Sequence, residues 1–154
     1  MRVRPWGRCS MVNLSETEKA YLAGIFDGEG TVGYYPANGS HTIYVQVTNT
    51  DSRVINWVKN LIPGGFVKTR KRHVNRKPVW EWLVRDRDLA IEVLNIIRPY
   101  LIIKADQVDL LLSLMNDERI LRGDSKRFQK LSPEIIEHRT SVEMQMKALK
   151  TVVH

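Results

Sequence analysis

The chain has 154 residues, of which 43% are hydrophobic, and a formal net charge of +7. This length favours one domain built around one hydrophobic core. The lone Cys9 excludes an intramolecular disulfide framework and a cysteine-based metal site, and it favours a reducing compartment. The apolar runs are shorter than the roughly 18 residues of a membrane span, and the first residues lack the apolar segment of a signal peptide. We therefore expect a soluble, intracellular protein with no membrane partner, in the cytoplasm or an organelle.

The positive charge is concentrated in two parts of the chain. Residues 1–13 form a basic arm with Arg2, Arg4 and Arg8 and no acid. Residues 68–87 hold eight Lys and Arg against two acids, whereas residues 100–154 hold nine against eight and are not expected to share their role. Because phosphate is a common partner of such basic segments, residues 68–87 predict a nucleic-acid-binding surface. A solvated basic loop is the simpler alternative.

The first predicted element is a helix from Glu16 to about Asp27 or Gly28. Ser15 and Glu18 form a capping box, the spacing that begins many helices. The second half of this helix therefore carries the residues described next.

Small residues line one face of this helix, and two acids lie at its end. Ala20, Gly24 and Gly28 recur every four residues, which allows another helix to approach closely. Asp27 and Glu29 lie at the carboxyl end, where the helix dipole repels carboxylates. We expect a bound cation to resolve this conflict.

Four strands and three further helices are predicted after the first helix. Strands at residues 31–35 and 42–48 flank a turn at 36–40, and strands at 66–72 and 79–84 flank a polar loop at 73–78. Between these pairs, Thr50 or Asp51 caps a helix with an apolar stripe of Val54, Val58, Leu61 and Ile62.

The helices after the last strand follow from caps and apolar periodicity. Asp86 or Asp88 begins a helix that ends before Pro99 and turns Leu89, Ala90, Val93, Leu94 and Ile97 inward. Residues 104–116 form a periodic helix with Val108, Leu111, Leu112 and Met115 on one face. A charged connector at 117–131 leads to a last helix that begins at Ser132 and Pro133.

The run LAGIFDGEG resembles the signature of the LAGLIDADG homing endonucleases. Its apolar and small residues occupy their positions in that signature, and Glu29 takes the final acidic position, which is more often Asp. The resemblance covers residues 14–116 and implies an α+β fold of αββαββα order, with an antiparallel saddle-shaped sheet and C-terminal helices. The matching residues are Leu22, Ala23, Gly24, Asp27, Gly28 and Gly30, with Ile25 and Phe26 as the apolar pair.

The resemblance implies a metal-dependent endonuclease that hydrolyses both strands of a long, nearly palindromic double-stranded DNA target. It also implies that the protein is encoded within an intron. With one motif per chain, two sites require a homodimer whose motif helices meet through Ala20, Gly24 and Gly28. Oxygen ligands from Glu29 and the Gly28 carbonyl favour Mg²⁺, while Asp27 is expected to cap or orient the helix end.

Three further residues are predicted to be catalytic by the same resemblance. Lys104 follows the stretch that precedes the long core helix and is expected to stabilise charge on the phosphate. Asn49 is expected to help order the water network at the site. For Arg53, a catalytic role and an exposed salt bridge stay as equal alternatives.

Strand alternation predicts which side chains read the DNA bases. A twisted antiparallel ribbon fits the major groove, and every second side chain then points at base edges. Arginine suits guanine and Glu81 suits cytosine, although the strand parity of Glu81 is open because tryptophans flank it. The predicted reading residues are Lys68, Arg70 and Arg72 on the third strand, Tyr35, Ser40, Thr42, Tyr44 and Gln46 on the first two, and Glu81 on the fourth.

Two other functions stay open. The same fold can serve as a non-cleaving nucleic-acid binder, either a maturase that assists intron RNA folding or a DNA-binding regulator. A structural role, in which the helix only dimerises a basic scaffold, leaves the acid at position 29 unexplained.

Overall fold

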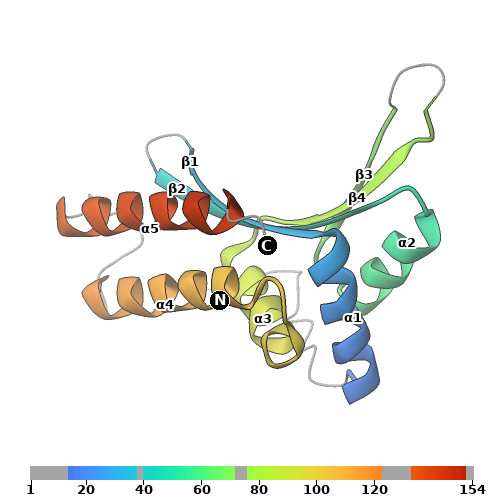
Figure 1. Cartoon of the computed structure of the whole chain (residues 1–154), viewed down its shortest axis with the longest axis horizontal. Coiled ribbons are helices and arrows are strands. Elements are labelled where there is room, and N and C mark those ends of the chain that lie inside the picture. Colours follow the sequence, from blue (N-terminus) through green and yellow to red (C-terminus); the bar gives the residue numbers. More distant parts are fainter. Residues whose placement is uncertain (1–13, 38–39, 72–75, 123–132, 152–154) are drawn as a thin grey trace, which may run out of the picture.

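The computed structural model describes residues 14–37, 40–71, 76–122 and 133–151. Its elements follow the predicted αββαββα order, with two further helices at the C-terminal end (Figure 1). The predicted α+β fold is confirmed, while the basic arm at residues 1–13 and Arg72 lie outside the described residues. The elements are α1 (Glu16–Glu29), β1 (Gly30–Ala37), β2 (Ser40–Asn49), α2 (Ser52–Leu61), β3 (Phe66–Arg70), β4 (Val79–Val84), α3 (Arg87–Ile97), the 3-10 turn η2 (Arg98–Tyr100), α4 (Ala105–Arg122) and α5 (Pro133–Thr151).

Polar side chains begin the first three helices. The Ser15 hydroxyl accepts a hydrogen bond from the backbone N–H of Glu18 at 3.2 Å, and the Glu18 carboxylate accepts one from the Ser15 N–H at 2.8 Å. This confirms the predicted capping box. Of the alternatives for the next two helices, Asp51 caps α2 and Asp86 caps α3.

The sheet separates an apolar face, covered by helices, from an open polar face. Its strand order is β1-β2-β4-β3, and all neighbours are antiparallel. Val45 and Val47 of β2 are fully buried against the helices, and Trp82 of β4 pairs with Val47 on the same face. Figure 1 shows α1, α2 and α3 on this side of the sheet, while the two hairpins rise away from them. The opposite face is thus free of those three helices.

The turn between β1 and β2 is shorter than predicted. Pro36 and Ala37 belong to β1, and Ser40 already belongs to β2, so residues 38–39 alone connect the strands. Pro36 is tolerated because β1 is an edge strand, where a missing N–H can point away from the neighbouring strand.

Two helical predictions need correction. In α2 the buried residues are Ile55, Val58 and the cap residue Ile62, whereas Val54 and Leu61 are only partly buried. The apolar pattern admits both faces, and packing under β2 and β4 selects the one that contains Ile55. The second correction concerns α4, which continues to Arg122 through part of the predicted connector because α5 packs along it.

The two C-terminal helices lie side by side next to β1 (Figure 1). His138 of α5 lies 3.2 Å from the Asp117 carboxylate of α4, and Val142 and Met146 of α5 are buried. Neither of these helices, nor any other in the described part of the chain, is both long and apolar enough to cross a membrane.

Candidate nucleic-acid interface and active centre

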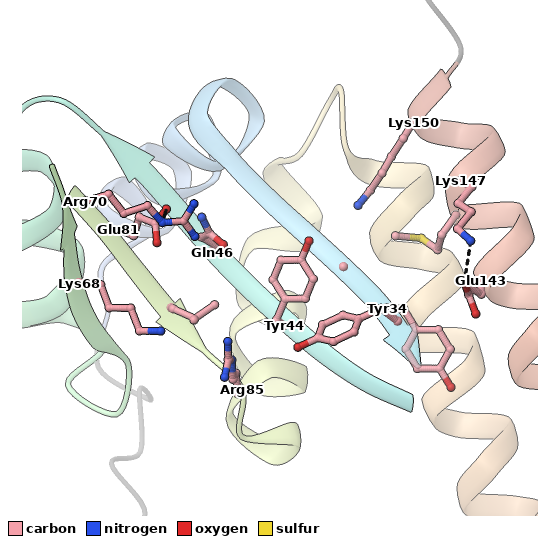
Figure 2. A pocket seen from close by; sticks show the side chains of 14 residues that line it. Tyr34, Tyr44, Gln46, Lys68, Arg70, Glu81, Arg85, Glu143, Lys147 and Lys150 are labelled. Atoms are coloured by element: carbon pink, nitrogen blue, oxygen red, sulfur yellow. Dashed lines mark hydrogen bonds and ion pairs between the residues drawn. The ribbon is translucent and has the colours of Figure 1, made fainter. Parts of the chain in front are cut away.

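A hollow extends over the open face of the sheet (Figure 2). Strand alternation places the predicted reading residues of β1, β2, β3 and β4 on this face, as the registers of the three strand pairs require. Thr42 lies opposite Tyr35 on the same face, and Ser40 is described only as part of β2. The predicted residues that line the hollow are Tyr35, Tyr44, Gln46, Lys68, Arg70 and Glu81.

A glycine lets an aromatic side chain lie across two strands. A β-carbon on Gly33 would come within 1.8 Å of the Tyr44 ring, so the ring occupies the space of the missing side chain. The Tyr35 and Tyr44 rings meet edge to face, with centroids 5.5 Å apart. Burial, and then the neighbouring Tyr35, raises the pKa of the Tyr44 phenol.

Glu81 already forms an ion pair with a neighbouring arginine. Its side chain is 4% exposed, and its carboxylate lies 2.9 Å from the Arg70 guanidinium, which extends into solvent. Lys68 pairs with Glu81 in the strand register and places its ammonium over the Phe66 ring at 5.2 Å. Glu81 therefore points toward the hollow, which resolves the strand parity that the sequence left open. Its carboxylate pairs with Arg70 of the same chain.

The hollow also has a wall that the sequence did not predict. Lys147 and Lys150 of α5 line it from the side of β1 (Figure 2). The nearly neutral charge of residues 100–154 concealed these lysines, because eight acids almost balance the nine Lys and Arg of that segment. One local signal for the position of α5 was available in the sequence. Val142 and Met146 are four residues apart on one helix face, and both are buried where α5 packs against the rest of the protein.

Asp27 joins the end of α1 to the start of α4. Its carboxylate accepts hydrogen bonds from the backbone N–H groups of Ile102 at 2.8 Å and Lys104 at 3.0 Å. The Lys104 ammonium in turn donates to the Asp27 carbonyl. The conflict between Asp27 and the dipole of α1 is thus resolved by the positive end of α4 and by Lys104. This contact, and not the expected bound cation, stabilises the Asp27 carboxylate.

Glu29 lies exposed at the last position of α1, close to Lys104. Burial lowers the pKa of the Lys104 ammonium, and the charges of Asp27 and Glu29 oppose that shift. Within the described residues, the Glu29 carboxylate has no hydrogen-bond or ion-pair partner, and no three His, Cys, Asp or Glu side chains gather around one point. Glu29 is therefore available to a ligand. The described part of one chain holds no cluster of three such side chains that could enclose a metal ion.

Asn49 ends β2, Arg53 lies in the first turn of α2, and both make local contacts. The Asn49 amide oxygen accepts a hydrogen bond from the Asp51 N–H at 2.8 Å. Arg53 forms a bidentate pair with Asp51, at 3.0 and 2.6 Å, and its side chain is 89% exposed. Because solvent screens such an exposed pair, Arg53 can exchange Asp51 for a phosphate at small cost.

The predicted contact stripe is open surface on this chain. Ala20, Gly24 and Gly28 are all exposed on α1. A β-carbon added to Gly24 or Gly28 would meet no atom within 4 Å. Packing within the described chain therefore gives no reason for these glycines, although each costs about 1 kcal/mol in a helix.

A family model described as the LAGLIDADG-like domain matches residues 16–116 of the chain. The chain belongs to the LAGLIDADG family. The match begins at the first residue of α1 and ends within α4, so α5 and its lysines lie outside it. No curated protein sequence is significantly similar to this LAGLIDADG chain.

Solved structures share the fold at low sequence identity. The homing endonuclease I-CvuI, in complex with its target in the presence of 2 mM Ca, is 20% identical, with a TM-score of 0.54 over 89% of this chain and 97% of that one. The archaeal intron-encoded homing endonuclease I-Vdi141I, complexed with DNA, is 13% identical, with a TM-score of 0.65 over 90% and 87%. The group I intron-encoded I-CeuI, also complexed with DNA, is 15% identical, with a TM-score of 0.60 over 86% and 67%. At these identities the likeness establishes the fold.

Proposed function

We propose that this protein is an intron-encoded, homodimeric, Mg²⁺-dependent endonuclease that cleaves both strands of a long, nearly palindromic DNA target. The observation that carries the proposal is Glu29, which is exposed at the end of α1 close to Lys104 and has no hydrogen-bond or ion-pair partner in the described parts of the chain. Membership of the family and DNA-bound relatives such as I-Vdi141I support it.

The homodimer follows from the number of acids and from the open stripe. One chain supplies one Glu29, and cleavage of two antiparallel strands needs two equivalent centres related by a two-fold axis. The exposed Ala20, Gly24 and Gly28 allow the α1 helices of two copies to approach closely. Such an approach places both copies of Glu29 near the axis, because Glu29 follows directly after the last residue of the stripe.

The donor set at the end of α1 fits Mg²⁺. Glu29 offers an exposed carboxylate and Gly28 a carbonyl, and oxygen donors without His or Cys favour this ion. I-CvuI has also been solved with a DNA target in the presence of 2 mM Mg, with the DNA not cleaved. Bound Mg²⁺ supplies an activated water and stabilises the leaving oxygen. Lys104, held in place by Asp27, adds a positive charge beside the phosphate, while Asn49 at the end of β2 supports the water network and Arg53 of α2 supports the phosphate.

The open face of the sheet is the proposed DNA-binding surface. Its strands are antiparallel and twisted, the geometry that enters a major groove. Arg70 offers a guanidinium with geometry suited to guanine O6 and N7, and Lys68 lies beside it. Tyr35, Thr42, Tyr44 and Gln46 contact further base edges in this proposal.

The test is selection of cleaved duplexes from a random DNA library with Mg²⁺, followed by the Glu29→Gln variant on the selected target. We expect one class of cut sites, and we expect the variant to bind the target while its cleavage rate falls at least about 100-fold, through loss of one essential charged group. Asp27→Asn is the matched control, because its role is to hold α4 and it retains an acceptor oxygen. Unchanged cleavage by Glu29→Gln would remove this residue from the mechanism.

Two further measurements separate the proposal from its alternatives. If the wild-type protein binds structured intron RNA tightly and never nicks DNA in Mg²⁺, the maturase alternative replaces the endonuclease. Gly24→Leu tests the dimer, because the chain itself has room for the side chain while a second α1 helix would not. We expect a folded monomer by analytical ultracentrifugation. An unaltered dimer would place the interface elsewhere.

A further inference from the structure

Lys150 lies where the hollow over the sheet meets the surroundings of the active centre. It lines that hollow from α5, and Figure 2 shows its side chain extending from α5 toward β1. It also lines a second hollow together with Gly30, Thr31 and Lys104. Since Gly30 follows Glu29 in the chain, this second hollow adjoins the proposed active centre.

The Lys150 ammonium differs from its neighbour on the same helix. Lys147, three residues earlier, lies 2.8 Å from the Glu143 carboxylate. Among the residues that the structure describes, Lys150 has no hydrogen-bond or ion-pair partner. Partial burial lowers the pKa of its ammonium. Because the residue as a whole is exposed, an arriving anion can reach this ammonium and would stabilise its charge.

The position of Lys150 indicates which anion this is. Lys68, Arg70 and Arg85 line the hollow from β3 and from the end of β4, and Lys150 lines it from α5 on the β1 side (Figure 2). A duplex on the sheet would therefore meet positive charge at both walls. A lysine carries a compact point charge and lacks the planar guanidinium with which arginine binds guanine in two places. A backbone phosphate therefore suits it better than a base edge.

We propose that Lys150 binds a backbone phosphate of DNA at this junction and so positions the strand against Glu29 and Lys104, an inference that rests on the proposed DNA cleavage. Lys150 is a DNA-contacting, positioning residue in this account. It lies outside the residues matched by the family model, so this contact is a property of the C-terminal helix of this chain.

The test measures how the affinity for a random-sequence duplex of about 30 base pairs depends on salt, in Ca²⁺ and at equal protein concentration. For Lys150→Met we expect the slope of log affinity against log salt to fall by about one per subunit, and affinity at about 0.1 M salt to fall about tenfold per contact. Lys147→Met is the matched control, because it removes the same charge from the same helix, and it should change the slope much less. Lys150→Arg should restore most of the slope.

A second measurement uses the selected target and single-turnover cleavage at saturating protein. Lys150→Met should slow cleavage more than Lys147→Met does, since a displaced strand lies out of register with Glu29 and Lys104. Equal effects of the two variants on slope and rate would show a response to net charge alone and would overturn the proposed contact while leaving the endonuclease intact. A wild-type protein that binds no duplex would instead overturn the proposed function. Circular dichroism confirms that each variant is folded.

Discussion

Removal of the Asp27 carboxylate tests the link between α1 and α4. The carboxylate accepts hydrogen bonds from two backbone N–H groups at the start of α4, at 2.8 and 3.0 Å. A hydrogen bond to a charged group contributes about 1.5–3 kcal/mol. Ile102 is 85% exposed, so water can replace its partner, whereas Lys104 is half-buried and loses more. We therefore count the hydrogen bond from Lys104 in full and a small part of the one from Ile102. The expected loss in the free energy of unfolding for Asp27→Ala is about 2–3 kcal/mol.

The assay is urea unfolding followed by circular dichroism, with a thermal scan at the same protein concentration because a dimer's stability depends on concentration. The expected loss corresponds to a Tm about 5–10 °C lower for a chain of this size. Asp27→Asn keeps one acceptor oxygen and should lose about 1 kcal/mol.

Glu29→Gln is the matched control, since Glu29 is an acid on the same turn of α1 and has no partner among the described residues. It should stay within about 0.5 kcal/mol of the wild type, the usual range for exposed substitutions. If Asp27→Ala were as stable as Glu29→Gln, the two hydrogen bonds would not be what holds α4 to α1, and the reasoning would be refuted.

Three further predictions concern the fold. Gly30→Ala should cost about 1–3 kcal/mol in urea unfolding, because its β-carbon would come within 2.5 Å of the Phe26 ring and carbonyl oxygen; a stability equal to wild type would contradict this packing. Ile55→Ala should cost about 2–5 kcal/mol, since Ile55 is fully buried in α2, and a loss below about 0.5 kcal/mol would return the buried face to the one first predicted. Hydrogen bonds from the Arg53 side chain lower the pKa of Asp51 from 3.8 to about 2, so this pair stabilises the fold above pH 3.8 and its contribution is lost as the pH falls toward 2. An NMR titration of Asp51 should show that midpoint and move back toward 3.8 in Arg53→Gln, and an unchanged midpoint in the variant would exclude Arg53 as the cause.

Local sequence patterns were sufficient for the cap of α1 and for the two faces of β2. Ser15 with Glu18 begins α1, and alternation in β2 separates the buried valines from Tyr44 and Gln46. These features depend on residues two to four positions apart, so a short window contains the physical cause. The buried face of α2 was mistaken because its apolar residues extend around the helix, and only packing under β2 and β4 distinguishes Ile55 from Val54.

The candidate site divides in the same way. The motif at the end of α1 predicts Glu29 as the essential acid, and the basic segment predicts Lys68 and Arg70 as DNA-reading residues. The use of Glu81 by Arg70 could not be predicted, because strand parity at Glu81 is fixed by the register of β3 on β4.

The sequence by itself determined the family, the order of the elements and the small-residue stripe of α1, because each is written in residues that are neighbours along the chain. Only the tertiary structure decided that Asp27 accepts a hydrogen bond from Ile102, 75 residues further along the chain and just before α4, and that Lys150 lines the same hollow as Lys104. The physical reason is that charge and hydrogen-bond energies depend on distance in space. The fold sets that distance by packing α4 and α5 against β1, and no local period of the sequence records it.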